Sequence, residues 1–275
     1  MRPFGKRNWQ ITNENRTVAN HMKNSSKMRK IVIIIIIFLF SNFENYAQEN
    51  KKFSFQFDIG TSITIPYKST IEFQTLLPIN GSYKTNYKID YGYFAEILSS
   101  YNKNEKISVT TGLNYNYISY RINDGEGIIT SKGNLNNSYL NIPLLLNYRL
   151  SENTPISISA GTYFGLLLFA QEKGTSYLDT SNLIFADPND PLLQPEQDYE
   201  NNIAEDYYSV DYGVLLQLEY EFSLKEKISG VILSRFNYGL KNVLSSGIDK
   251  SKTMHSAAYE WKNYNILIGI GIKIR

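Results

Sequence analysis

The sequence predicts an all-β fold, an antiparallel up-and-down barrel of eight strands. Three observations predict it. Apolar and polar residues alternate with a period of two in eight stretches, which gives each strand two different faces. These stretches are longer than an ordinary strand of about 5 to 6 residues. The segments between them are alternately long and short along the chain.

The first strand is expected at residues 53–65, where the alternation is clearest. One face carries Phe53, Phe55, Phe57, Ile59, Ile63 and Ile65. The other face carries Ser54, Gln56, Asp58, Gly60, Ser62 and Thr64. Because neighbouring side chains of a strand point to opposite sides, this strand separates an apolar environment from a polar one.

The next three strands are expected at residues 86–100, 106–121 and 138–150. Their apolar faces carry Ile89, Tyr91, Tyr93, Ala95 and Ile97, then Ile107, Val109, Leu113, Tyr115 and Tyr117, then Leu140, Ile142, Leu144, Leu146, Tyr148 and Leu150. Their polar faces carry Asp90, Gly92 and Glu96, then Ser108, Thr110, Gly112, Asn114 and Asn116, then Asn141, Asn147 and Arg149. Arg149 alternates with leucines, so it is expected to point away from the apolar side.

The last four strands are expected at residues 156–170, 207–222, 227–241 and 261–275. Their apolar faces carry Ile156, Ile158, Ala160, Phe164, Leu166 and Leu168, then Val210, Tyr212, Val214, Leu216, Leu218, Tyr220 and Phe222, then Ile232, Phe236, Tyr238 and Leu240, then Tyr264, Ile266, Ile268, Ile270, Ile272 and Ile274. Their polar faces carry Ser157, Ser159, Gly161 and Gly165, then Asp211, Gly213, Gln217, Glu219 and Glu221, then Arg235, Asn237 and Gly239, then Asn265, Gly269, Gly271 and Lys273.

The connections between the strands predict that the barrel crosses a membrane. The short ones are "YNKNE" (101–105), "SENTP" (151–155) and "SLKE" (223–226). The long ones are residues 66–85, 122–137, 171–206 and 242–260. A tilted strand of about 9 to 11 residues spans a bilayer, and short turns at one rim with long loops at the other are typical of outer-membrane barrels. We therefore expect a transmembrane barrel in the cell outer membrane, with short periplasmic turns, long extracellular loops and membrane lipid around it.

The first 47 residues are expected to be an over-long start followed by a cleaved signal peptide. The apolar run "IVIIIIIFLF" reaches only about 15 Å as a helix, half of the hydrocarbon core, so it is too short to span. Basic residues precede this run, and the small residue Ala47 follows it before Gln48, as in a secretory signal. Residues 48–275 are then the barrel domain.

Aromatic residues gather near the strand ends. Phe53, Phe55, Tyr148, Tyr220 and Phe222 are expected near the short-turn rim, and Tyr117, Tyr120, Tyr207, Tyr208, Trp261 and Tyr264 near the long-loop rim. This placement predicts aromatic girdles at the two membrane interfaces. The general preference of aromatic residues for strands is the alternative explanation.

Several strand motifs carry a resemblance to a known family. The segments "SYLNIPLLLNYRL", "ISISAGTYFGLLL", "DYGVLLQLEYEFSL", "SRFNYGLKNV" and "LIGIGIKIR" resemble the outer-membrane beta-barrel family of Bacteroidota, which includes PorT-like proteins. The resemblance extends from about Phe53 to Arg275, and it implies the barrel fold. PorT is associated with type IX secretion, and the resemblance leaves open whether this chain shares that role. One departure is Arg275, where many such barrels carry an aromatic residue. The motifs hold no catalytic residues.

The polar face is expected to fill the barrel. An eight-stranded barrel is just wide enough for its own side chains. The inward charges are expected to be Asp58, Asp90, Glu96, Asp211, Glu219 and Glu221 against Arg149, Arg235 and Lys273. Buried charges need partners, so we expect Arg149 and Arg235 to bridge inward carboxylates and plug the lumen. A proton or ion pathway along these charges is the alternative.

The sequence predicts no catalytic, cofactor-binding or metal-binding residues and no enzymatic activity. There is no cysteine, the net charge of +2 does not favour nucleic-acid binding, and no phosphate-binding loop is present. The expected mature chain has a single histidine, His255, which is expected to lie on the surface of a loop. A membrane-embedded lipid-modifying enzyme and a secreted lipocalin-like carrier remain the alternatives.

The third long connection, about residues 171–206, is the expected site for a protein partner. It combines acidic residues with the apolar residues Leu183, Ile184, Phe185, Leu192 and Leu193. Long loops on a rigid scaffold commonly carry binding functions. Calcium binding is an alternative for the acidic residues, although they lack the spacing of a calcium-binding loop.

Overall fold

The computed structural model describes residues 52–74, 82–126, 129–151, 154–178, 196–244 and 261–275. They form one antiparallel sheet of ten strands: β1 (Phe53–Ile65), β2 (Thr70–Gln74), β3 (Ser82–Asn102), β4 (Ile107–Glu126), β5 (Ile129–Arg149), β6 (Ile156–Leu178), β7 (Glu196–Asn202), β8 (Val210–Lys225), β9 (Ile228–Gly239) and β10 (Tyr264–Ile274). A 3₁₀ turn, η3 (Ala204–Asp206), precedes β8. No helix in these ranges is long and apolar enough to cross a membrane.

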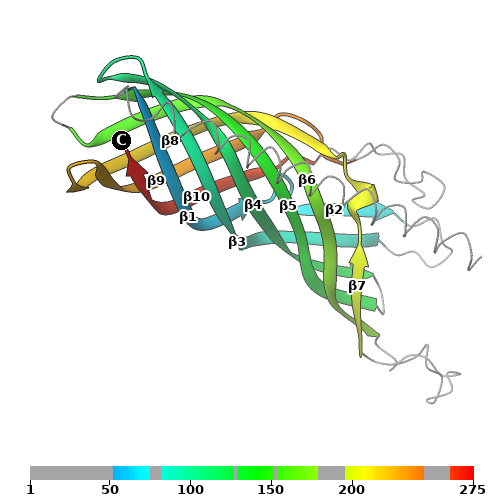
Figure 1. Ribbon diagram of the computed structural model, residues 1–275. Coiled ribbons are helices and arrows are strands. Elements are labelled where there is room, and N and C mark those ends of the chain that lie inside the picture. The colour runs from blue at the N-terminus through cyan, green and yellow to red at the C-terminus, as the bar shows by residue number, and fades with distance from the viewer. Residues whose placement is uncertain (1–51, 75–81, 127–128, 152–153, 179–195, 245–260) are drawn as a thin grey trace, which may run out of the picture. The chain divides into compact units, whose positions relative to one another are not determined.

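Eight of the strands close into a ring. The neighbours follow the order β1-β10-β9-β8-β6-β5-β4-β3, and β1 pairs with β10 along one edge and with β3 along the other (Figure 1). Every pairing is antiparallel, and each ring strand begins within four residues of its predicted start except β5, which begins nine residues earlier, at Ile129. The predicted eight-stranded up-and-down barrel is therefore confirmed.

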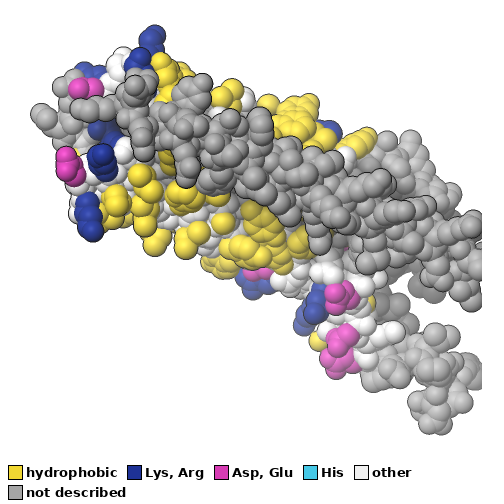
Figure 2. All heavy atoms as spheres, viewed as in Figure 1, with side chains coloured by type: hydrophobic (Ala, Val, Ile, Leu, Met, Phe, Trp, Pro, Cys, Tyr) yellow, Lys and Arg dark blue, Asp and Glu magenta, His cyan; other side chains and the backbone are white. Residues whose placement is uncertain are grey.

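The outer wall of this ring is apolar. Ile59, Leu144, Leu146, Leu216 and Ile270 are between 53% and 63% exposed. Figure 2 shows apolar side chains gathered along the wall, with charged side chains toward its ends. A wall of exposed leucine and isoleucine matches the hydrocarbon of a bilayer. It is the reverse of a lipocalin-like carrier, whose apolar face would point inward.

The inner face is mainly polar and tightly packed. Buried polar side chains reach it from every ring strand, among them Gln56, Glu96, Asn114, Asn141, Ser159, Gln217, Arg235 and Asn265. A smaller apolar cluster of Phe94, Val231, Leu233 and Leu267 shares the interior. The Phe94 ring covers Gly60 and Gly269, where an added Cβ would come within 2.6 Å of it. These two glycines therefore leave the space that the ring occupies.

Three short turns and one long extension distinguish the two ends of the ring. β3 to β6 have 21, 20, 21 and 23 residues, whereas β9 and β10 have 12 and 11. β2 pairs with β3, and β7 pairs with β6, so six strands continue the sheet at the long-loop end (Figure 1). The connection expected at 122–137 is therefore largely strand, and so are the described parts of the connection at 171–206, which are 171–178 and 196–206.

A register shift corrects the expected direction of Asp90. The pairing of β3 with β4 shifts between Ile89 and Tyr93, which is the signature of a β-bulge. The Asp90 carboxylate accepts hydrogen bonds from Ser119, at 2.8 Å, and from Asn134, at 2.9 Å. Ser119 shares its face of β4 with Arg121, whose side chain is 57% exposed and lies 3.5 Å from the Asp90 carboxylate. Asp90 thus belongs to the outer wall and not to the lumen.

The expected outer girdle is also wrong for three aromatic residues. Tyr148, Tyr220 and Phe222 are 39% to 48% exposed, as a girdle at the short-turn rim requires. Tyr120, Tyr207 and Trp261 are at most 8% exposed, and they pack together inside the long-loop end. These residues close the interior and do not face lipid.

The expected signal peptide, His255 and the apolar residues 183–193 of the third long connection lie outside the described residues.

Candidate functional site

The lumen of the barrel is the candidate site, and its centre is a buried ion pair. Arg235 on β9 donates two hydrogen bonds to the Glu96 carboxylate on β3, at 2.7 and 2.8 Å. The Arg235 Nε donates to Gln217 at 2.7 Å, and Asn114 donates to Glu96 at 3.0 Å. Arg235 is only 2% exposed. Two parallel bonds between planar groups, with further partners on both sides, hold a pair of charges in a buried position.

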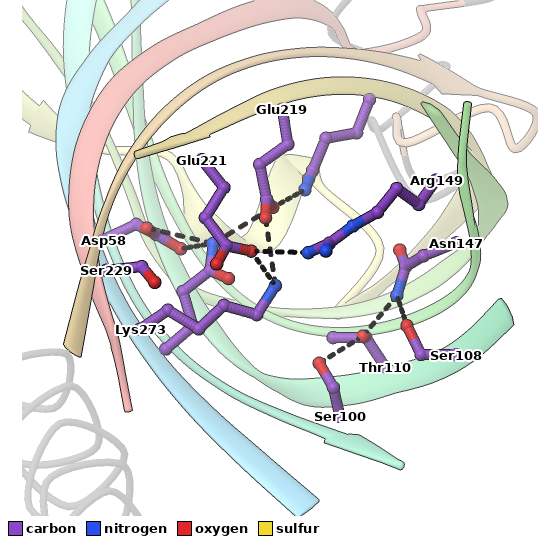
Figure 3. A network of polar contacts seen from close by, with 12 residues as sticks. Asp58, Ser100, Ser108, Thr110, Asn147, Arg149, Glu219, Glu221, Ser229 and Lys273 are labelled. Carbon is purple, nitrogen blue, oxygen red and sulfur yellow. Dashed lines mark hydrogen bonds and ion pairs between the residues drawn. The ribbon is translucent and has the colours of Figure 1, made fainter. Parts of the chain in front are cut away.

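A second cluster of charges lies toward the short-turn end (Figure 3). Lys273 Nζ is 3.1 Å from a Glu219 oxygen and 3.5 Å from a Glu221 oxygen. Arg149 donates to Glu221 at 3.2 Å, and Arg275 also pairs with Glu221. The predicted pairing of Arg149 and Arg235 with inward carboxylates is therefore confirmed. Arg275 was not among the expected partners.

Two glutamines join the two clusters. Gln56 donates to both Asp58 oxygens, at 3.2 and 3.0 Å, and to Glu219 at 3.2 Å. Gln217 donates to Glu219 at 3.1 Å and also accepts from Arg235. An amide can donate and accept at once, so it can stand between a carboxylate and a guanidinium. The result is a continuous polar network from the short-turn rim to the middle of the lumen.

Hydroxyl and amide groups cover the facing wall. Asn147 donates to Thr110 at 2.5 Å and to Ser108 at 3.0 Å, and Thr110 and Ser100 share a hydrogen bond of 2.5 Å (Figure 3). These residues come from β3, β4 and β5. Asn147 thus points inward, as the alternation in the fourth predicted strand requires.

Aromatic side chains pack together at the long-loop end of the lumen. Trp261 packs edge-on against Tyr120, with ring centroids 5.4 Å apart, and lies 4.6 Å from Tyr87. The segment after β9 reaches this cluster through Val243, whose N–H donates to the carbonyl of Trp261 at 2.9 Å. Next to the cluster, on its lumen side, the Asp211 carboxylate accepts hydrogen bonds from Asn263, at 3.0 Å, and from Tyr163, at 3.2 Å.

Sequence reasoning identified the charged members of the network and missed the amides that join them. Gln56, Asn114 and Gln217 were placed on the polar faces, but their partners depend on the stagger between strands. The aromatic cluster did have a sequence signal, because Tyr120 shares the alternation of the inward Asn114 and Asn116, and Trp261 shares that of Asn265. The girdle prediction placed the two aromatic residues by their position near strand ends and overlooked this alternation. Within the described residues, no group of three or more His, Asp or Glu side chains is arranged to hold a metal ion.

Comparison with known proteins identifies the family. A family model described as outer membrane protein beta-barrel domain matches residues 41–245. The chain belongs to this outer membrane protein beta-barrel domain family. It is therefore an outer-membrane protein. The family match says nothing specific about the PorT-like proteins of Bacteroidota, so that narrower resemblance stays a prediction. No curated protein matches the chain.

Several solved structures show distant similarity to this chain, among them that of the outer membrane protein OprG. OprG from Pseudomonas aeruginosa is 12% identical, with a TM-score of 0.39, over 82% of this chain and 98% of that chain. Neisserial surface protein A is 12% identical, with a TM-score of 0.36, over 81% and 96%. Ail from Yersinia pestis is 12% identical, with a TM-score of 0.34, over 81% and 99%.

Proposed function

We propose that this outer-membrane barrel does not conduct ions and acts as a structural protein that binds another protein at its extracellular end. The Arg235–Glu96 ion pair carries the proposal. It joins strands that are not neighbours in the ring, and its charged groups are buried inside the lumen. A path for water or ions would have to break this pair, which costs several kcal/mol when one charge is left unpaired.

Single-channel recording in planar bilayers tests the closed lumen. The wild type should be silent, because charged and amide side chains fill the short-turn half and aromatic side chains fill the other end. The double variant Arg235→Ala with Glu96→Ala should open a conducting path. Its matched control is Lys173→Ala with Glu200→Ala, which removes an exposed ion pair outside the lumen and should stay silent. Folding of each variant is checked by heat-modifiable gel mobility, and steady wild-type conductance would favour the ion pathway instead.

The extracellular strands support the binding role. β7 pairs with β6 on one side, and its other edge pairs with no described strand. Glu196, Asp198 and Glu200 alternate along β7 and therefore share one face. An unpaired strand edge can accept an added strand from another chain. We propose that the region around 171–206 binds an extended protein segment with basic side chains.

Cross-linking on intact cells tests this binding. A photo-reactive residue at the exposed Gln197 position should capture a protein partner, and a probe at the exposed Lys103 on a short turn should not. The variant Asp198→Lys with Glu200→Lys should lose the cross-link while the barrel still assembles. Unchanged cross-linking in that variant would contradict the proposed acidic edge. Deleting about 180–205 should also spare assembly and abolish capture.

A role in type IX secretion is the narrower proposal, and it is supported by the strand motifs shared with PorT-like proteins. Deleting the gene should abolish secretion of type IX cargo, and the wild-type gene should restore it. Normal secretion in the deletion strain would exclude this role while leaving the binding proposal intact. No catalytic step is part of either proposal.

A further inference from the structure

A small cavity lies inside the lumen, in its half nearer the long-loop end. It has a volume of about 10 Å³, and its lining includes Asn116 on β4, Asp211 on β8, Asn237 on β9 and Asn265 on β10. Such a volume accommodates about one water molecule or one small ion. Asn237 and Asn265 are direct cross-strand partners, so the register of β9 and β10 brings their side chains to the same height.

The cavity is lined by oxygen atoms that accept no hydrogen bond. The Oδ1 atoms of Asn116, Asp211, Asn237 and Asn265 are all buried without a partner among the described residues. These side chains are between 2% and 7% exposed. The hydroxyl of Tyr139, which also lines the cavity, is buried without a partner too and can donate to one of these oxygens. Buried polar atoms in folded proteins are almost always paired, so the remaining acceptors indicate a missing positive or donating group.

The number and charge of these oxygens favour a cation over water. A water molecule has two hydrogens, so even with the Tyr139 hydroxyl donating to a third acceptor one of the four stays unpaired, whereas a cation can contact all four. Asp211 also brings a negative charge, and its hydrogen-bond donors, Asn263, Tyr163 and the backbone N–H of Tyr212, are all neutral. The charge of Lys241 favours the carboxylate, but Lys241 forms no ion pair with Asp211 in the described part of the chain and lies over the Tyr208 ring, 4.6 Å from its centre.

We propose that this cavity binds one sodium ion through the side-chain oxygens of Asn116, Asp211, Asn237 and Asn265. One carboxylate and three amide oxygens match the charge of a monovalent cation. Calcium takes 6 to 8 oxygen ligands, usually with several carboxylates, so it fits this set less well. The bound sodium ion neutralises Asp211 and ties four ring strands together inside the barrel.

The dependence of stability on sodium tests the site. Urea unfolding of the complete barrel in detergent micelles is measured in NaCl, KCl and choline chloride at constant ionic strength. A ligand that binds only the folded state raises the unfolding midpoint in proportion to the logarithm of its concentration. Above saturation, each tenfold increase in sodium should lower the unfolding equilibrium constant tenfold, and potassium and choline should have a much smaller effect.

Two variants separate this site from general effects of salt. Asp211→Asn keeps the shape of the side chain and removes its charge, so the sodium dependence should disappear. Asp198→Asn makes the same chemical change on the exposed β7, and the dependence should remain. An equal sodium dependence in Asp211→Asn, or no sodium dependence in the wild type, would overturn the proposal.

A direct measurement covers the case in which Asp211→Asn fails to fold. Crystals of the wild type grown in NaCl should show a density peak in the cavity whose contacts to the four oxygens are shorter than hydrogen bonds, and crystals grown in choline chloride should lack these short contacts. A peak at hydrogen-bond distances in both salts, as for a water molecule, would overturn the proposal.

Discussion

Arg235 and Glu96 are bonded to each other across the lumen, although β1 and β10 separate their strands in the ring. The residues are 139 positions apart in the sequence. Each also has an amide partner, Gln217 for the guanidinium and Asn114 for the carboxylate. The pair therefore connects β3 and β9 across the lumen through side chains, in addition to the backbone hydrogen bonds that join neighbouring strands.

Removing one partner of this pair should destabilise the barrel strongly. Arg235→Ala leaves Glu96 buried without its cation, and such a change typically costs about 3 to 5 kcal/mol. Urea unfolding in detergent micelles measures it. The double variant Arg235→Met with Glu96→Leu should lose less than either single change, because no charge is left unpaired. Additive losses would show that the two side chains do not interact.

The loss of stability caused by a charged residue on the outer wall should depend on the depth of that residue in the bilayer, and two positions of β8 test this. Leu216 is 58% exposed in the middle of the strand, and Leu224 is 53% exposed beside the short turn. Arginine on the lipid face costs about 2 to 4 kcal/mol at the bilayer centre and about 0 to 1 near the interface. Leu216→Arg should therefore destabilise the barrel in lipid vesicles far more than Leu224→Arg. Equal effects would contradict the assignment of the apolar wall to lipid.

Two glycines with different neighbours should respond differently to alanine. At Gly92, beside the register shift of β3, an added Cβ would meet the backbone carbonyl of Tyr117. At Gly230 the nearest atoms all belong to the Phe222 ring, which can move. Gly92→Ala should lower the free energy of unfolding by about 3 kcal/mol, at the upper end for overpacking. Gly230→Ala should lower it by less than about 1 kcal/mol. Unfolding midpoints of the two variants, measured together, provide the comparison.

The extracellular hairpin of β6 and β7 should become less stable as pH rises from about 4 to 7. Burial raises the pKa of Asp206 above its usual range, with Glu205 adding to the effect, and burial likewise raises the pKa of Glu172. A carboxyl group with a raised pKa in the folded state contributes stability at low pH, which is lost as it ionises. Amide exchange in residues 196–206 should therefore speed up with pH beyond its intrinsic rate. Asp206→Asn should weaken this dependence, and an unchanged dependence would assign it to other groups.

The membrane-spanning part of the fold could be predicted because lipid imposes a strict pattern. Leu144 and Leu146 must face hydrocarbon, so Asn147 and Arg149, which alternate with them, must face the lumen. The period of two residues therefore assigns every side chain of such a strand to one of the two faces. Outside the bilayer this constraint ends. The stretch around Asn134 and Asn136 is polar on both faces, so the continuation of β4 and β5 gave no alternation to detect.

The errors within the site have two origins. The direction of Asp90 depends on one extra residue in β3 that only the pairing with β4 reveals. Tyr120 and Trp261 follow the alternation of the inward Asn114 and Asn265, and the prediction failed because it gave more weight to their position near strand ends. Partners such as Gln56 and Glu219, which are 163 residues apart, depend on the stagger of the closed ring.

The closure of β1 against β10 also has a consequence for the order of assembly. Until the last strand is in place, the sheet has two open edges and Glu219 lacks Lys273. Contacts between residues so distant in sequence must overcome a large loss of chain entropy before they contribute, so folding is expected to be slow. The open intermediate would expose unpaired strand edges that can join with other chains. The pairing of β1 with β10 removes those edges and at the same time brings Lys273 to Glu219. The lumen network is therefore completed only in the last step of membrane assembly.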